Sequence, residues 1–362
     1  MTHTLYHGDC LDILPTLPAN SVDLIATDPP YYKVKGDSWD RQWDKPESFL
    51  SWLDTVLAEL YRVLKPNGSL YLFASPRMAA RVEVLIAQRF NVLNRITWAK
   101  PEPTSEINYG ASNGGRMSKE AMRRYYPNTE AIIFAEHYGA EGYAKGEAGY
   151  GAKCDELRGF VFEPLRAYLA SERDRAGVTN PQINAAWCEW KGVNSTSQTQ
   201  KWFSNSCFNP PTREAYTWLQ QTLSGLNHGG EYLTREYEYL RREYEDLRRE
   251  YEDLRREYED LRRPFNVSAD VPYTDVWTFK TVNAYPGKHP TEKPLPLMRH
   301  IIEASSRPGA VVLDCFMGSG TTGKAAQDLG REFIGIEKDA GYFAQAKRRI
   351  ESVQPALMEA AD

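Results

Sequence analysis

The chain has 362 residues, of which 41% are hydrophobic and 26% are charged, and its formal net charge is −5. This composition is typical of a globular protein with a large core and room for a second module, and it excludes a global basic field that attracts nucleic acid. No hydrophobic run approaches the length of a membrane span, and the first residues do not resemble a signal peptide. We therefore expect no membrane partner, and any nucleic-acid-binding surface must be local.

The five cysteines show neither a CxxC pair nor the spacing of metal ligands. An odd number of cysteines without such spacing predicts free thiols in a reducing compartment and no metal site. We therefore expect a cytoplasmic protein whose chemistry does not depend on a bound metal ion.

Strands and helices alternate in the first part of the chain. Short apolar runs predict strands within residues 5–10, 22–27, 69–74, 92–98 and 129–136, and helical spacing predicts helices at 47–64 and 77–89. This alternation predicts an α/β fold with a doubly wound, mostly parallel sheet. Asp9 follows the first strand, where it either meets the polar edge of a ligand or caps the helix that begins at Leu11.

The second strand runs directly into Asp28-Pro29-Pro30-Tyr31. The prolines end the strand and fix the backbone, so a carboxylate, a rigid carbonyl and an aromatic ring lie within four residues at the carboxyl edge of the sheet. A carboxylate and a carbonyl can accept both hydrogens of an exocyclic amine, while a ring stacks on a flat heterocycle. The alternative interpretation is a Pro-Pro turn, so the context of the motif has to decide.

Residues 101–127 interrupt the alternation and predict a long loop with several prolines and glycines. Four basic residues gather toward its end, namely Arg116, Lys119, Arg123 and Arg124. This cluster suits contact with phosphates, and a merely solvated loop is the alternative interpretation.

Residues 155–224 predict a separate helical module with helices at 157–175, 182–190 and 195–203. Helices joined by a glycine-containing turn are typical of helix-turn-helix DNA-binding modules. The third helix would present side chains that hydrogen-bond to base edges and phosphates, among them Ser197, Gln198, Gln200 and Lys201. An ordinary helical insertion with a polar face is the alternative.

Four heptads fill residues 235–262 and predict one long helix. Tyrosines at one core position alternate with leucines at the other, giving Tyr237, Leu240, Tyr244, Leu247, Tyr251, Leu254, Tyr258 and Leu261. Such a seam indicates either a coiled coil that makes a homodimer or a single helix laced with ion pairs.

The last part of the chain predicts a helix at 295–305, a strand at 310–314, a turn with Gly318 and Gly320, and a strand that ends in Glu337. A glycine-rich turn between a strand and a helix lets a ligand approach backbone N–H groups. An acidic residue about 20 positions after the glycines can hydrogen-bond to ribose hydroxyls. Because a full Gly-x-Gly-x-x-Gly and a Walker lysine are missing, a nucleoside without a pyrophosphate fits better.

In this order the motifs resemble those of the DNA amino-methyltransferases of the permuted class called β, in which Asp-Pro-Pro-Tyr precedes the target-recognition region and the S-adenosylmethionine loop closes the chain. The resemblance covers residues 3–136 and 271–352. It implies a Rossmann-like methyltransferase fold, S-adenosylmethionine as cofactor and double-stranded DNA as partner. It also implies four parts: a catalytic half at 1–150 with the mobile loop 101–127, a target-recognition module at 151–230, the heptad helix at 231–264, and a cofactor-binding half at 265–362.

The resemblance also implies the roles of individual residues. Catalysis falls to Asp28, Pro29, Pro30 and Tyr31. Contact with the cofactor falls to Asp9 and Cys10 at the adenine, Glu337 at the ribose, and Phe316, Gly318, Ser319, Gly320, Thr321 and Thr322 around the methionine end. Asp28 and Lys293, the latter in a segment that matches the family's cofactor-adjacent segment, complete the set.

Asp at the first motif position favours the N6 amine of adenine, because N4-cytosine enzymes of the family more often carry Ser there. The resemblance therefore implies an adenine N6-methyltransferase of a phage, prophage or restriction-modification type. An N4-cytosine DNA methyltransferase is the main alternative. A helix-turn-helix regulator on an inactive methyltransferase scaffold, and methylation of RNA or protein, are the further alternatives.

Overall fold

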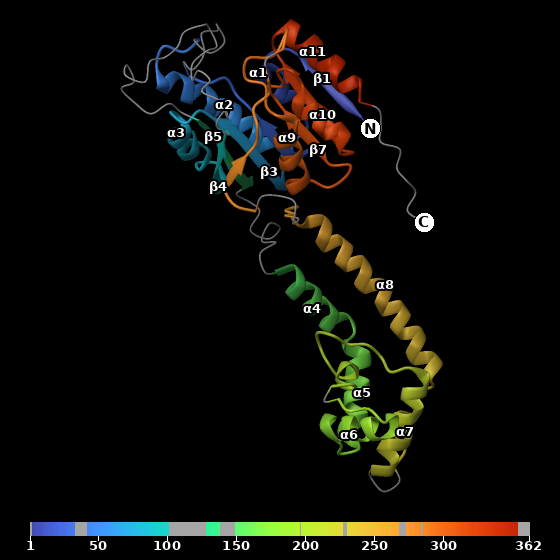
Figure 1. Ribbon diagram of the computed structural model, residues 1–362. Helices are drawn as coiled ribbons and strands as arrows, with labels where there is room; N and C mark the ends of the chain where they lie inside the picture. The colour runs from blue at the N-terminus through green and yellow to red at the C-terminus, as the bar shows by residue number, and fades with distance from the viewer. Residues whose placement is uncertain are drawn as a thin grey trace. The chain divides into compact units, whose positions relative to one another are not determined.

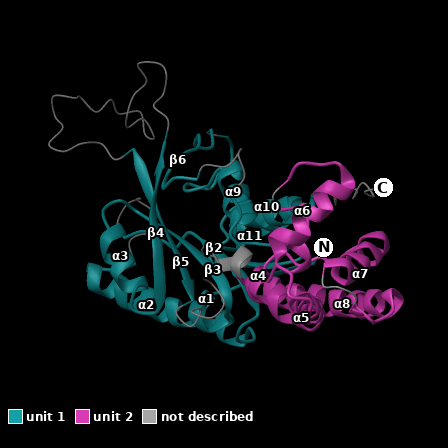
Figure 2. Ribbon diagram, turned by 90° about the horizontal axis from the view of Figure 1, so that it is seen from below, with its two compact units in different colours: residues 1–145, 263–362 teal, residues 146–262 magenta. Residues whose placement is uncertain are grey.

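The computed structural model describes residues 2–32, 42–100, 128–137, 149–195, 197–226, 230–267, 273–283 and 285–353. The chain divides into two compact units, coloured separately in Figure 2. Residues 1–145 and 263–362 form one unit, here called the sheet unit, and residues 146–262 form the other, the helical unit. The four functional parts expected from the sequence remain predictions, because compactness alone assigns no role.

The sheet unit is built on one sheet whose strands, in spatial order, are β1-β8-β7-β2-β3-β5-β4-β6. Every neighbouring pair is parallel except those of β5, which runs antiparallel to both β3 and β4. The expected mostly parallel α/β sheet is therefore confirmed. The strands are β1 (His3–His7), β2 (Val22–Thr27), β3 (Leu64–Ala74), β4 (Phe90–Ala99), β5 (Thr129–His137), β6 (Val276–Thr278), β7 (Val311–Asp314) and β8 (Glu332–Glu337).

Helices cover both faces of the sheet (Figure 1). Along β3, Leu70 and Leu72 point into a core shared with the first group of helices, while Tyr71 and Phe73 point into the core on the other face. This alternation follows from the two-residue period of a strand. The first face carries α1 (Cys10–Ile13), the 3-10 turn Leu14–Thr16, α2 (Pro46–Val63) and α3 (Ala79–Ile86), and the second carries α9 (Leu295–Ser305), α10 (Thr321–Asp328) and α11 (Ala340–Glu351).

The carboxyl ends of β2, β7 and β8 lie at one edge of the sheet because these strands are parallel neighbours. Asp28 follows β2, Asp314 ends β7 and Glu337 ends β8. The chain leaves β2 toward α2 and leaves β7 toward α10, which lie on opposite faces. The crevice at such a reversal is where open α/β sheets bind ligands.

The helical unit contains α4 (Gly149–Val161), α5 (Glu163–Arg175), α6 (Asn180–Lys191), the 3-10 turn η5 (Gln200–Trp202), α7 (Arg213–Leu226) and α8 (Tyr237–Leu261). Thr179 and Gln182 form a capping box at the start of α6, and Gly192 ends that helix in the left-handed conformation. The expected single helix at 157–175 is instead two helices. Pro164 lies in the first turn of α5, where its missing N–H is tolerated, and it could not continue α4.

The expected third helix at 195–203 was wrong. Only the three residues of η5 are helical there. The Asn184 side chain donates to the Ser195 carbonyl at 2.7 Å and accepts from the Thr199 backbone N–H at 3.2 Å. These bonds satisfy backbone groups that a helix would have paired internally, so the segment follows an irregular path over α6. The predicted recognition helix of a helix-turn-helix is therefore absent from the described residues.

The heptad repeat forms the continuous helix α8, as expected. Its seam packs on its own chain: Leu240 and Tyr251 are buried in the core of the helical unit, and Tyr237, Tyr244, Leu247 and Leu254 lie against that core. Only the end of the seam is open, since Leu261 is 50% exposed. The homodimer expected from the seam stays a prediction, and most of the surface it would use is already occupied.

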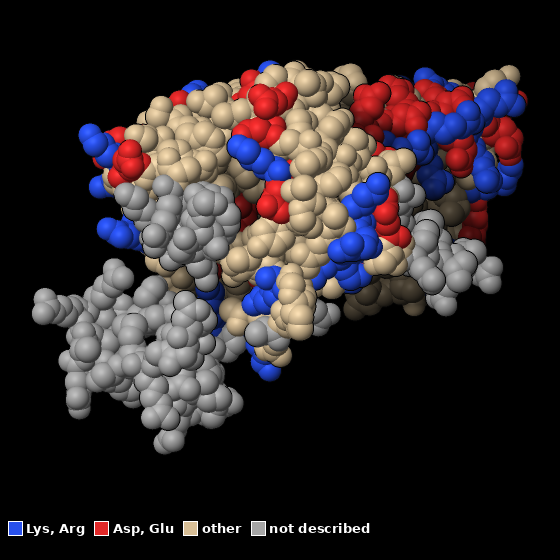
Figure 3. All heavy atoms as spheres, turned by 90° about the horizontal axis from the view of Figure 1, so that it is seen from above, with Lys and Arg blue, Asp and Glu red and all other residues tan. Residues whose placement is uncertain are grey.

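On the face shown in Figure 3, basic and acidic side chains are interspersed rather than separated. No helix among the described residues is both long and hydrophobic enough to cross a membrane. All five cysteines are free thiols.

Gly320 allows the glycine-rich turn to approach α11. Its φ is +80°, and a Cβ there would lie 2.9 Å from Cα and Cβ of Ala346. Gly309, at φ +79°, has open space around the same position. We expect Gly309→Ala to lower the free energy of unfolding by about 1 kcal/mol, from backbone strain alone. Gly320→Ala should cost more, on the order of 3 kcal/mol, because the clash adds to the strain. Chemical denaturation of both variants measures these differences. Equal losses of unfolding free energy would contradict the close approach of Gly320 to Ala346.

Asp314 links β7 to β2 by accepting a buried hydrogen bond from the Thr27 hydroxyl, and burial raises its pKa to about 6 from an ordinary 3.8. Such a carboxyl binds its proton more tightly in the folded protein. Its contribution to stability is therefore complete below pH 4 and is lost as the pH rises through about 6. Relative to the wild type, Asp314→Asn should gain about 2 kcal/mol of unfolding free energy between pH 4 and 7. Urea titrations of both proteins across that range measure the difference, and a constant gap would count against this prediction.

Candidate active site

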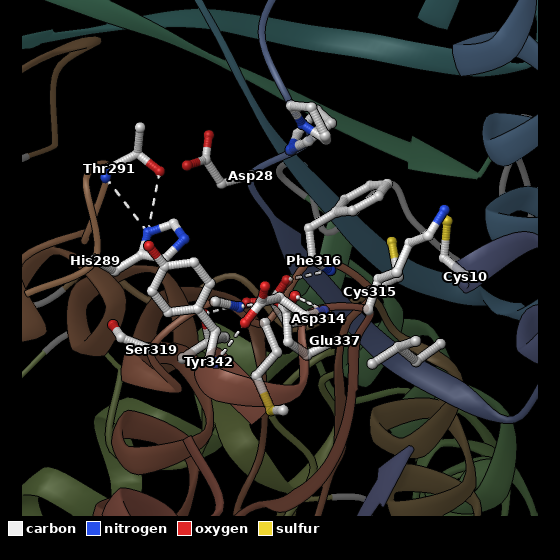
Figure 4. A pocket seen from close by; sticks show the side chains of 18 of the residues that line it. Cys10, Asp28, His289, Thr291, Asp314, Cys315, Phe316, Ser319, Glu337 and Tyr342 are labelled. Atoms are coloured by element: carbon white, nitrogen blue, oxygen red, sulfur yellow. Dashed lines mark hydrogen bonds between the residues drawn. The ribbon is translucent and has the colours of Figure 1, made fainter. Parts of the chain in front are cut away.

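A cavity of about 480 Å³ opens at the carboxyl edge of the sheet. Figure 4 shows Asp28 and Thr291 in the upper part of the view, with Asp314 and Glu337 below them. All of the predicted catalytic residues and all but one of the predicted cofactor residues line the cavity: Asp9, Cys10, Asp28, Pro29, Pro30, Tyr31, Lys293, Phe316, Gly318, Ser319, Thr321, Thr322 and Glu337. Gly320 is the exception, since it faces Ala346 of α11.

Asp28 is positioned by the proline pair at the end of β2. One of its oxygens, Oδ2, accepts a short hydrogen bond from Nζ of Lys293, which is 7% exposed. The other oxygen, Oδ1, is buried and has no hydrogen-bond partner among the described residues. A buried carboxylate oxygen without a partner is costly, so this atom is an acceptor awaiting a donor from a ligand.

Glu130, the second residue of β5, completes the charge cluster. Its carboxylate accepts from Nζ of Lys100 at 2.7 Å and from the Tyr31 hydroxyl at 3.1 Å, and it lies 3.3 Å from Nζ of Lys293. Burial raises the pKa of Glu130, but the charges of Lys293 and Lys100 outweigh burial and hold that pKa below its usual value. Asp28 has one lysine beside it instead of two, and burial keeps its pKa raised.

Tyr31 is held between the cavity and the core on the α9 face. Its ring is 8% exposed and lies with its centroid 5.5 Å from Nζ of Lys293. The bond from its hydroxyl to Glu130 fixes the ring orientation. Tyr31 therefore presents a fixed aromatic wall next to the open oxygen of Asp28.

The glycine-rich turn is fixed by Glu337. Its carboxylate accepts from the Gly318 backbone N–H at 2.7 Å and from the Asp339 N–H at 2.8 Å. Burial raises the pKa of Glu337. Gly318 has φ +50° and lies against the His289 ring, which is 3.4 Å from the place a Cβ would take. A carboxylate has about four acceptor positions, so Glu337 retains capacity for hydroxyl donors of a ligand.

Asp9 caps the N-terminus of α1, which was one of its two predicted roles, and it also lines the cavity. It accepts from the Leu11 backbone N–H at 3.0 Å and pairs with Lys338 at 2.9 Å. Burial raises the pKa of the neighbouring Cys10 thiol to about 12, so this cysteine packs against the cavity as a neutral side chain.

Arg349 of α11 joins the glycine-rich turn to the segment 285–293. It donates to the Ser319 and Thr321 hydroxyls at 3.0 and 2.9 Å, to the Tyr285 hydroxyl at 3.1 Å, and to Glu292 at 2.8 Å. Ser319 and Thr321 are therefore already partly engaged by the protein. Their hydroxyls help to hold the cavity wall in shape.

Sequence reasoning missed Glu130, Lys100 and Arg349. The signal for Glu130 was an acidic side chain directly before the apolar run 131–135 of a strand, where a buried carboxylate needs a charged partner. No local pattern distinguishes Arg349 from the other basic residues of its helix. The resemblance implies a cofactor contact for Lys293, which lines the cavity, and its Nζ also contacts Asp28, Glu130 and the Thr291 carbonyl.

Of the residues predicted to contact DNA, Arg116, Lys119, Arg123 and Arg124 lie outside the described residues. Ser197, Gln198, Gln200 and Lys201 are exposed on the irregular segment of the helical unit, between buried Thr199, Trp202 and Phe203.

The cavity lining is acidic. Two lysines, Lys293 and Lys338, face six carboxylates: Asp9, Asp28, Glu292, Asp314, Glu337 and Asp339. Such a lining favours a ligand that carries positive charge and several hydroxyl or amine donors. Within the described ranges, no group of three or more His, Cys, Asp or Glu side chains is arranged to hold a metal ion.

The family described as DNA methylase matches residues 22–348. Among curated proteins, the chain is 27% identical over 352 residues to the DNA adenine methyltransferase YhdJ of Escherichia coli (strain K12), covering 96% of this chain and 82% of that protein. It is 23% identical to the Type II methyltransferase M.HinfI of Haemophilus influenzae, covering 98% of this chain and 69% of that protein.

Among solved structures, the cytosine-N4-specific PvuII DNA methyltransferase aligns with a TM-score of 0.50 at 13% identity, over 98% of this chain and 89% of that one. The M1.HpyAVI–SAM complex aligns with a TM-score of 0.49 at 22% identity, over 97% and 99%. The family match spans both the Asp28 motif and the glycine-rich turn that meet at the cavity. The chain therefore belongs to the DNA methylase family of N6 and N4 amino-methyltransferases.

Proposed function

We propose that the protein transfers a methyl group from S-adenosylmethionine to the N6 amine of an adenine flipped out of double-stranded DNA. The observation that carries the proposal is the buried, unpartnered Oδ1 of Asp28 in the cavity. An exocyclic amine supplies N–H donors that such an acceptor can bind. The similarity to the adenine methyltransferase YhdJ and the membership of the DNA methylase family support the same class of reaction.

The cavity suits S-adenosylmethionine in size and charge. Its volume of about 480 Å³ lies in the range of small-molecule sites. The acidic lining favours the sulfonium and the ammonium of this cofactor, and Glu337 can accept from ribose hydroxyls. Asp9 and Cys10 would lie at the adenine, and Phe316, Gly318, Ser319, Thr321 and Thr322 at the methionine end.

The chemistry follows from the poor nucleophilicity of the target amine, whose lone pair is delocalised into the ring. When bound, S-adenosylmethionine supplies a methyl group on a sulfonium sulfur, and that sulfur keeps the electron pair of the broken bond. Asp28 Oδ1 and the Pro29 carbonyl accept the two amine hydrogens, which localises the lone pair on nitrogen. Tyr31 provides the aromatic wall for the base. As the nitrogen–carbon bond forms, the Asp28 carboxylate takes one of the two amine protons.

The N4 amine of cytosine is the second candidate, since it presents the same two hydrogens and the fold is shared with a cytosine-N4 enzyme. Asp28, where N4-cytosine enzymes of the family more often carry Ser, favours adenine. The absence of the third helix from the described residues weakens the case for a helix-turn-helix regulator. We also propose a cytoplasmic location, in the same compartment as the DNA.

Asp28→Asn should lower methylation about a hundredfold or more, because the amide can no longer accept the amine proton. The assay incubates each protein with unmethylated bacterial DNA and S-adenosylmethionine, and mass spectrometry of the nucleosides identifies the product. Asp12→Asn, an exposed carboxylate of α1 outside the cavity, is the matched control.

If N6-methyladenine forms with the wild type and disappears with Asp28→Asn, both the proposed reaction and the proposed role of Asp28 are supported. N4-methylcytosine would retain the mechanism and overturn the choice of base. Cofactor binding without any product on single- or double-stranded DNA would overturn the DNA substrate and point to RNA, protein or regulation.

Arg349→Gln should weaken binding of S-adenosylmethionine on the order of tenfold, because the turn that holds the methionine end loses its charged hydrogen bonds to Arg349. Isothermal titration calorimetry measures this. Arg348→Gln on the same helix is the control, since that residue is exposed. Equal affinities in the two variants would refute the role of Arg349.

A further inference from the structure

Four charged side chains form a continuous row at the cavity: Asp28 and Lys293, which line it, followed by Glu130 and Lys100, whose side chains are 16% and 26% exposed. Lys293 contacts Asp28 Oδ2 and lies 3.3 Å from Glu130 Oε2, and Lys100 contacts Glu130 Oε1 at 2.7 Å. Signs alternate along the row, so each charge inside it has an opposite charge beside it. Lys293 is 7% exposed and has aromatic rings on two sides, with Nζ 4.9 Å from the centroid of Phe73 and 5.5 Å from that of Tyr31.

The row distinguishes the two oxygens of Asp28. Oδ2 is engaged by Lys293, and Oδ1 remains buried and unpartnered within the described part of the chain. Rotation of the carboxylate would separate Oδ2 from the lysine at a high cost, because a buried charge would lose its partner. A change of the Lys293 side-chain conformation would also break its contact with Glu130. The open oxygen is therefore held in one place.

We propose that Lys293, anchored by Glu130, is a positioning residue that fixes Asp28 with Oδ1 directed to the target amine and favours the ionised form of the carboxylate. This inference rests on the proposed amine methylation and gives Lys293 a role toward Asp28 rather than toward the cofactor. Lys293 and Glu130 act through Asp28, and neither exchanges a proton with the substrate.

The charges that act on Asp28 come from several elements. Lys293 precedes α9, Glu130 belongs to β5, Asp314 ends β7, and the Tyr31 hydroxyl lies next to Glu130. Burial raises the pKa of Asp28, Lys293 lowers it, Glu130 raises it, and the Tyr31 hydroxyl lowers it. For Lys293 itself, burial lowers the pKa, but Asp28 and Glu130 together raise it above its usual value. The lysine therefore stays charged and favours the ionised form of Asp28.

Two substitutions then have opposite consequences. Lys293→Met removes the positive charge next to Asp28, so the acid limb of the pH profile for methyl transfer should move up by about 1 to 3 pH units. Glu130→Gln keeps the shape and removes a negative charge, so the same limb should move down. A role in packing alone would lower the rate in both variants without moving the limb in either direction.

Single-turnover methylation of DNA between pH 5 and 9 measures the limb for the wild type and both variants. Lys65→Met is the matched control, because Lys65 is also ion-paired, with Asp23 at 2.7 Å, but lies outside the cavity lining. Its profile should coincide with that of the wild type. Lys293→Met should also recover part of its rate at high pH, where Asp28 ionises without the lysine.

A second readout needs no DNA. Carbon-13 NMR of labelled aspartate carboxyls, with the Asp28 signal identified by its loss in Asp28→Asn, follows the ionisation of this group directly. Calorimetry with S-adenosylmethionine and thermal melting test cofactor binding and folding, and we expect the affinity of both variants to stay within about threefold of the wild type.

Opposite displacements of the Asp28 titration in the two variants, with cofactor affinity retained, support the proposal. An Asp28 titration that moves in neither variant would overturn it. Loss of cofactor affinity in Lys293→Met, with the titration unchanged, would also overturn it and return Lys293 to the cofactor site. Because the NMR measurement is independent of turnover, failure of the wild type to methylate DNA would count against the proposed function alone.

Discussion

The ion pair between Asp28 and Lys293 joins residues that are 265 positions apart in the chain. It forms because α9, which begins two residues after Lys293, packs on the sheet face to which β2 contributes Leu24 and Ala26. The end of β2 and the start of α9 are thereby brought to the same edge. One oxygen of Asp28 is left open only when both parts of the chain are folded together. The geometry of the proposed catalytic carboxylate is therefore a product of the whole sheet unit rather than of its own motif.

Two consecutive residues of opposite charge, Glu292 and Lys293, connect the Asp28 carboxylate to the glycine-rich wall of the cavity. Glu292 pairs with Arg349, which holds the hydroxyls of the glycine-rich turn, and Lys293 pairs with Asp28. A shift of the backbone at these two positions would move both ends at once. The proposed sites of the methyl donor and of the target amine thus share one short segment, which suits a reaction that depends on the alignment of two bound molecules.

Local sequence patterns were sufficient to predict the strands and turns that carry the motifs. Apolar runs buried on both faces identified β2, β7 and β8, because a covered parallel sheet leaves few polar positions. Proline after β2 and glycine after β7 marked the ends of these strands. Since parallel neighbours end at one edge, the meeting of Asp28 with Glu337 in one cavity followed from the predicted sheet. The Lys293 motif was recognised too, but its partner was not.

Where local and long-range interactions compete, the sequence was not sufficient to predict the structure. A glycine-containing turn followed by polar residues suggested a third helix at 195–203, but Asn184, more than ten residues earlier, bonds to the backbone there and the helix does not form. The heptads determined one long helix, whereas tertiary packing decided that most of its seam faces its own chain. The sequence by itself determined the strands, the turns and the order of the motifs, because each depends on neighbouring residues. Only the tertiary structure decided which oxygen of Asp28 is open, because Lys293 and Glu130 reach it from distant strands and segments.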